Sequence, residues 1–127
     1  MIPSWGGYKG GPSCVSDLST EQFLAKMKEF IRTGRRHFVA RTRNGVSYLQ
    51  HLADLGLTDV EEAWECVLDL EPTHYHSGPS LDYGDIASGL VIWVFKNEIN
   101  GIMAYIKLKD ETERRGCVCL SFHEDEP

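Results

Sequence analysis

The sequence lacks any long hydrophobic run. No stretch of about 18 apolar residues occurs, although a membrane-spanning helix needs roughly that length. The first residues, MIPSWGGYKGG, also lack the charged and apolar regions of a secretory signal peptide. We therefore expect a cytoplasmic protein with no membrane partner.

Cysteine is limited to four residues, Cys14, Cys66, Cys117 and Cys119. A chain of 127 residues with 42% hydrophobic residues can bury one core without disulfides, and a cytoplasmic compartment keeps thiols reduced. We expect free thiols that fill volume in the core. The sequence also lacks a C-x2-C pair, so the expectation is no bound metal and no cofactor.

Positive charge is in deficit overall, with a formal net charge of −6, but it is unevenly distributed. Residues 26–43 hold seven lysines and arginines against the single acid Glu29, whereas acids crowd into residues 58–72 and 110–126. A basic block of this kind is either a solvated helix face or a phosphate-binding groove. An acidic protein can therefore still bind nucleic acid locally.

The segment pattern predicts one domain over residues 19–127, after a glycine-rich lead-in over residues 1–18. Ser19 and Gln22 form a capping-box pattern, which predicts a helix from there to Gly34. Residues 36–42 predict a short strand, and residues 44–56 and 59–70 predict two short helices. Residues 73–89 have no period and predict a loop.

The last third of the sequence predicts strands at residues 90–95, 102–109 and 117–123. Helices followed by strands joined by short turns are typical of an α+β fold. We expect N-terminal helices packed on one face of a small, mostly antiparallel sheet.

The closing stretch GCVCLSFHEDEP could carry chemistry in three ways. Alternation along a strand places Cys117, Cys119, Ser121 and His123 on one face, with Val118, Leu120 and Phe122 on the apolar face. One zinc ion cannot bridge Cys117 and His123, about 20 Å apart along a straight strand. A zinc site with His74 and His76 would need a bent strand, and a nucleophilic cysteine would need a nearby base.

The third possibility crosses two strands. If residues 102–109 pair antiparallel with residues 117–123, Tyr105 and Lys107 share the outer face with Ser121 and His123. A phenol, an ammonium, a hydroxyl and an imidazole would then converge. The alternative is that this is simply the hydrated face of the sheet.

The order of segments resembles a known family. IRTGRRHFVART, YLQHLADLGLT, VLDLEPTHYHSGP, AYIKLK and VCLSFHEDE follow one another as in the MqsR family of type II toxins, whose fold is like that of RelE-type ribonucleases. The resemblance covers residues 20–126. It implies a metal-independent endoribonuclease, an mRNA interferase, that cuts single-stranded mRNA and is held inactive by a cognate antitoxin protein.

The resemblance also implies site residues. The functional tyrosine of the family falls on Tyr105, its last-strand basic residue on His123, and the basic residue of its Y-K-S motif on His76, while its glutamine is replaced by Ile92. We expect catalysis by Tyr105, His123, His76 and Lys107, and RNA binding by Arg35, Arg36, Tyr75 and Lys109.

The chemistry of such a site needs a base for the 2′-hydroxyl, cations for the phosphate and an acid for the leaving 5′-oxygen. Histidine can be acid or base, and the acidic tail beside His123 would favour its imidazolium form. A rival hypothesis keeps the fold without catalysis: an inhibitor or binding module that uses acidic residues 110–126 to mimic nucleic acid.

Overall fold

The computed structural model describes residues 12–126, with side chains from Thr20 onward. Residues 1–11 of the predicted lead-in and the side chain of Cys14 lie outside this part. The described elements are α1 (Pro12–Arg32), β1 (Arg36–Phe38), α2 (Tyr48–Asp54), α3 (Val60–Leu68), β2 (Tyr75–Leu81), β3 (Val91–Ile99), β4 (Ile102–Glu111) and β5 (Gly116–Glu124), with single 3₁₀ turns at Pro72–His74 and Ile86–Ser88.

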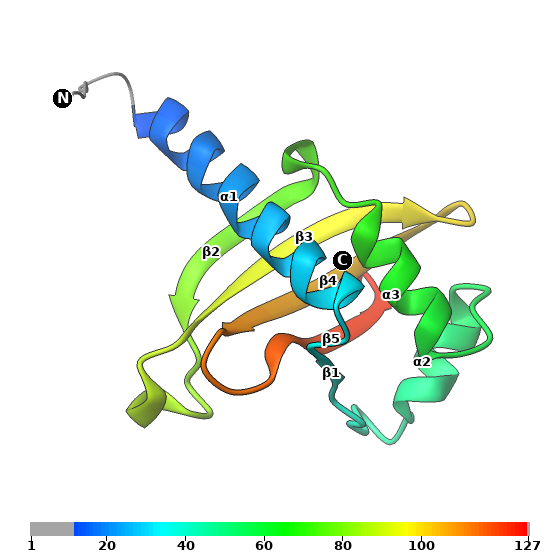
Figure 1. Cartoon of the computed structure of the whole chain (residues 1–127). Coiled ribbons are helices and arrows are strands. Elements are labelled where there is room, and N and C mark those ends of the chain that lie inside the picture. Colours follow the sequence, from blue (N-terminus) through cyan, green and yellow to red (C-terminus); the bar gives the residue numbers. More distant parts are fainter. Residues whose placement is uncertain (1–11, 127) are drawn as a thin grey trace, which may run out of the picture.

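The strands form one five-stranded sheet in the order β1-β5-β4-β3-β2 (Figure 1). The short strand β1 runs parallel to β5, and all other neighbours are antiparallel. The predicted α+β class with a mostly antiparallel sheet is therefore confirmed. Chain order explains the pattern, because β3, β4 and β5 follow one another through short turns.

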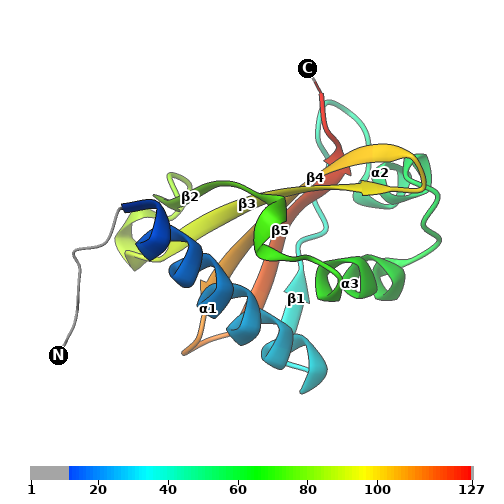
Figure 2. The ribbon, with the colours of Figure 1, turned by 90° about the horizontal axis from the view of Figure 1, so that it is seen from above.

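The core lies between the sheet and helices on one of its faces. Figure 2 shows α1 and α3 on the same side of the sheet, with α2 near the end of β5. Met27 of α1, Val67 of α3 and Phe95 of β3 are fully buried there, and Phe23 stacks on Trp93 with ring centroids 4.7 Å apart. No described helix is both long enough and apolar enough to cross a membrane.

Two sequence-based boundaries are wrong. Helix α1 begins at Pro12, so Ser19 lies inside the helix rather than at its cap. Proline suits the first turn because its missing N–H has no partner there anyway. Residues predicted as a loop contain strand β2, which pairs with β3 through an irregular register. As an edge strand, β2 tolerates Pro79 and Gly78 where a central strand would not.

Strand β5 contains a bulge that determines which side chains face the core. Lys107 pairs with Ser121 but Leu108 pairs with Cys119, so Leu120 is an extra residue on β5. Such a residue reverses the alternation on either side of it. Cys117 and Cys119 therefore face the core, and the prediction that they share a face with Ser121 and His123 is wrong.

Candidate functional site

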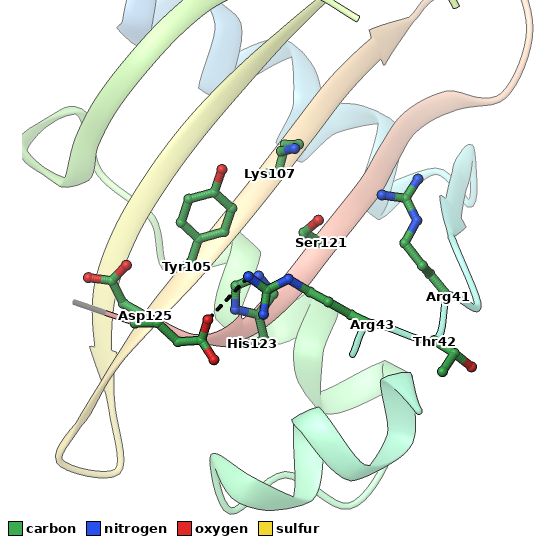
Figure 3. A pocket seen from close by; sticks show the side chains of 9 residues that line it. Arg41, Thr42, Arg43, Tyr105, Lys107, Ser121, His123 and Asp125 are labelled. Carbon is green, nitrogen blue, oxygen red and sulfur yellow. Dashed lines mark hydrogen bonds and ion pairs between the residues drawn. The ribbon is translucent and has the colours of Figure 1, made fainter. Parts of the chain in front are cut away.

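The sheet face opposite α1 carries a hollow of about 510 Å³ (Figure 3). Its walls come from β4, from the end of β5 and its acidic tail, and from the segment that follows β1. The lining residues are Arg41, Thr42, Arg43, Tyr105, Lys107, Ser121, His123, Asp125 and Glu126.

Strand pairing brings four of the predicted side chains together. Tyr105 lies directly opposite His123, and Lys107 lies directly opposite Ser121. All four line the hollow, as the alternation of β4 and the far half of β5 predicted. The prediction that they share one face is therefore confirmed; their catalytic roles stay predictions.

His123 is held in one orientation by two contacts. Its ring stacks on Tyr105 with centroids 5.0 Å apart and an interplanar angle of 11°. Its Nδ1 lies 2.8 Å from the Glu124 carbonyl oxygen, and because a carbonyl only accepts, Nδ1 must be the donor. In the neutral ring, Nε2 therefore carries the free lone pair.

The environment of His123 favours the neutral imidazole. Burial is the main reason that its pKa is lowered from 6.5, and the positive charge of Arg43 adds to the effect. The hydrogen bond to the Glu124 carbonyl and, more weakly, the charge of Glu126 act in the opposite direction and raise the pKa. The acidic tail thus acts in the predicted direction, but burial outweighs it and the net shift favours the neutral ring, which is suited to the role of base.

Two cations in the hollow lack a carboxylate partner among the residues that the structure describes. Arg41 is exposed, and Lys107 is partly buried on β4. Burial, together with the charges of Arg41 and Arg43, lowers the pKa of the Lys107 ammonium. The charge of Asp82 opposes this shift only in part, and positive charges crowded in this way favour an anionic ligand.

The acids at the rim are already paired with cations. Arg43 donates to Glu126 at 3.2 Å, and Figure 3 shows the Arg43 side chain extending toward His123. Asp125 forms an ion pair of 3.1 Å with Lys96 of β3. The tail thus partly neutralises the hollow, and no ion pair joins its described residues to Arg41 or Lys107.

Lys109, predicted to bind RNA, is buried instead. Its side chain is 2% exposed, and its ammonium contacts Asp82 at 2.9 Å, Asp85 at 3.2 Å and Glu111 at 3.5 Å. Burial alone would lower its pKa, but the hydrogen bonds to Asp82 and Asp85 outweigh that effect and raise it. An ammonium surrounded by carboxylates has no charge left for RNA, so this prediction is wrong.

Arg35 and Arg36 also lie away from the hollow. Arg36 pairs with Cys117 in the sheet, six residues before His123, which corresponds to roughly 20 Å along a strand. Its guanidinium binds Glu61 at 2.6 Å. Arg35 donates to the Thr112 carbonyl at 2.5 Å. The structure therefore does not bring either arginine into the site.

Tyr75 and His76 are not part of the hollow either. The ring of Tyr75 packs edge-on against Trp93 and Phe95, on the face that α1 covers, so it cannot stack a base beside Tyr105. His76 is exposed on the edge strand β2, with Nδ1 3.2 Å from the Ser77 hydroxyl oxygen. Strand β3 separates it from β4.

The cysteines lie in an environment that suppresses their reactivity. Cys117 and Cys119 are fully buried, as predicted, while Cys66 is partly buried. Burial raises the pKa of Cys117 to about 12 and also raises that of Cys119. Thiolate chemistry is therefore disfavoured, and both sulfurs face away from His123. Among the described residues, no group of three or more potential ligands is placed to hold a metal ion.

Three residues at the site were missed in the sequence. Arg41 and Arg43 belong to the basic block of residues 26–43. Only the strand order places them at the site: β1 runs parallel to β5, so the segment that follows β1 runs toward His123. The ring of His51 lies 5.6 Å from that of His123. The sequence indicates this position only through helical spacing: His51 follows Tyr48 by three residues, so both side chains lie on the same face of the helix.

Comparisons with family models, curated proteins and solved structures found no significant match.

Proposed function

We propose that the protein is a metal-independent endoribonuclease that cleaves single-stranded mRNA in the cytoplasm, as the toxin of a type II toxin–antitoxin pair of the MqsR type with a RelE-like fold. The observation that carries this proposal is the hollow in which a stacked Tyr105–His123 pair adjoins Arg41 and Lys107, two cations without an ion-pair partner in the described part of the chain. The family assignment rests on the sequence resemblance.

The proposed reaction uses the 2′-hydroxyl of the RNA as nucleophile. Neutral His123 accepts its proton at Nε2 while the 2′-oxygen bonds to phosphorus. The bond from phosphorus to the 5′-oxygen breaks, and Lys107 donates a proton to that oxygen. Arg41 and Arg43 stabilise the extra charge on the phosphate, and Tyr105 donates a hydrogen bond. Solvent then restores both protonation states.

The pKa shifts support this division of roles. A lowered pKa keeps His123 neutral and able to accept a proton at neutral pH. A lowered pKa also makes Lys107 a better proton donor than an ordinary lysine. His76, the second imidazole expected from the sequence, is replaced in this scheme by Lys107.

The non-catalytic alternative has less support. Mimicry of nucleic acid by residues 110–126 needs free carboxylates, but Asp110 pairs with Lys26 and Glu111 pairs with Arg115. Asp125 and Glu126 are also paired. An inhibitor built on this fold would therefore present a largely neutralised acidic segment.

Growth on expression of the protein alone tests the proposal. We expect arrest with the wild type and normal growth with the double variant Tyr105→Phe, His123→Ala at equal protein level. Arrest that persists in the double variant, or no arrest with the wild type, would contradict the ribonuclease function. Co-expression of a neighbouring small gene that restores growth would identify the antitoxin.

A further inference from the structure

A second histidine lies beside His123 but outside the hollow. His51 belongs to α2, a helix that starts from a defined N-cap, because the Ser47 hydroxyl accepts from the Gln50 backbone N–H at 3.2 Å. Leu52, the next residue, is fully buried and anchors the helix in the core. Two independent contacts thus position the His51 ring 5.6 Å from that of His123, tilted by 51°.

The Nε2 atom of His51 is buried and has no hydrogen-bond partner within the described residues. Both imidazoles border a small cavity of about 20 Å³, which adjoins the main hollow. A volume of roughly 10–15 Å³ is enough for one water molecule. Because a buried ring nitrogen needs a partner, this cavity is suited to a water that hydrogen-bonds His51.

Two imidazoles at this distance cannot easily both be charged. A like charge within about 6 Å disfavours protonation, so a positive charge on one ring opposes a positive charge on the other. The positive charge of His51 accordingly contributes to the lowered pKa of His123. The other charged and titratable groups that line the hollow and the small cavity are Arg41, Arg43, Tyr48, Tyr105, Lys107, Asp125 and Glu126.

We propose that His51 and His123 form an imidazole pair that shares a single proton, in which His51 is a positioning residue for the base His123. The proposal rests on the ribonuclease function proposed above. His51 does not line the main hollow, so it acts on the reaction through His123. Its protonation sets the lower pH limit at which His123 is still neutral.

NMR titration of the histidine rings, without RNA, tests the pair directly. In the wild type, the curves of His51 and His123 should each show two steps. In His51→Gln, His123 should titrate in one step with a higher midpoint, because the neighbouring charge is gone. His37→Gln, on β1 and outside the site, is the matched control and should leave the His123 curve unchanged.

Independent single-step curves in the wild type would overturn the proposal, and they decide the question even if His51→Gln fails to fold. An unchanged His123 midpoint in a folded His51→Gln would overturn it as well. In RNA cleavage, the acidic limb of the pH profile should move to higher pH in His51→Gln. Coupled titration without any RNA cleavage would support the imidazole pair and contradict the ribonuclease function. RNA cleavage without coupled titration would support the ribonuclease function and contradict the imidazole pair.

Discussion

The imidazole of His123 lies almost parallel to the phenol ring of Tyr105, with centroids 5.0 Å apart. The two residues pair directly across β4 and β5, so the sheet register holds the stack in place. Stacked aromatic pairs contribute about 0.5–1.5 kcal/mol beyond the area that they bury. The same contact covers one face of the imidazole, which helps to explain why burial dominates its pKa shift.

Folding stability should fall on acidification because of His123. Its pKa is lowered from 6.5 in the folded chain, so the unfolded chain binds more protons just below that pH. The free energy of unfolding should therefore decrease as the pH falls from 6.5 through the lowered value, and His123 should contribute no pH dependence well above 6.5.

Urea unfolding of the wild type and of His123→Gln between pH 5 and pH 8 measures this contribution. The difference in unfolding free energy between the two proteins isolates the histidine, because all other groups are shared. A wild type that gains stability relative to the variant on acidification would contradict the assigned direction of the shift.

Removing an unpaired cation from the hollow should weaken RNA binding. We expect Arg41→Ala and Lys107→Ala each to lower affinity for an unstructured RNA and to reduce the slope of log affinity against log salt by about 0.7. Arg36→Ala is the matched control, since Arg36 binds Glu61 outside the hollow. Fluorescence anisotropy at several salt concentrations gives the slopes. An equal loss in Arg36→Ala would place the RNA on a different surface.

Lys109 should matter for stability. Lys109→Met leaves Asp82, Asp85 and Glu111 without their central cation, and breaking a buried ion pair in this way costs about 3–5 kcal/mol. Lys96→Met removes a more exposed pair with Asp125 and should cost about 1 kcal/mol or less. Urea unfolding at pH 7 measures both. A loss in Lys109→Met as small as that expected for Lys96→Met would show that the cluster around Lys109 is not a stabilising element.

Glu126 should compete with an anionic ligand for Arg43. The two side chains form an exposed ion pair of 3.2 Å, and such pairs contribute about 0.2–1 kcal/mol. Glu126→Gln should therefore tighten RNA binding by up to about fivefold. Glu124→Gln also removes one exposed acid from the same strand end and should have a smaller effect. Weaker binding in Glu126→Gln would mean that the acid assists the ligand.

The alternation of hydrophobic residues predicted the faces of β4 correctly but those of β5 only in part. Ser121 and His123 lie beyond the bulge at Leu120 and face the hollow as expected. Cys117 and Cys119 lie before it and face the core. A bulge changes parity without a fixed residue signature, so the sequence alone could not reveal where the reversal occurs.

Long-range placement was the other limit of prediction. The fold class followed from segment order, and the Tyr105–His123 pairing followed from strand parity. The positions of the arginines did not follow from the sequence, because they depend on β1 running parallel to β5. Arg36 lies at the start of that pairing, whereas Arg41 and Arg43 lie beyond its end and reach the hollow. Local charge density could not distinguish them.

Cleavage of an unstructured RNA by the purified protein in EDTA tests the central claim most directly. The wild type should produce shorter fragments from RNA and none from DNA of the same sequence, which lacks the 2′-hydroxyl. The double variant Tyr105→Phe, His123→Gln should cleave at least about 100-fold more slowly. Equal cleavage by the wild type and the double variant, or no cleavage by the wild type, would contradict the proposed function.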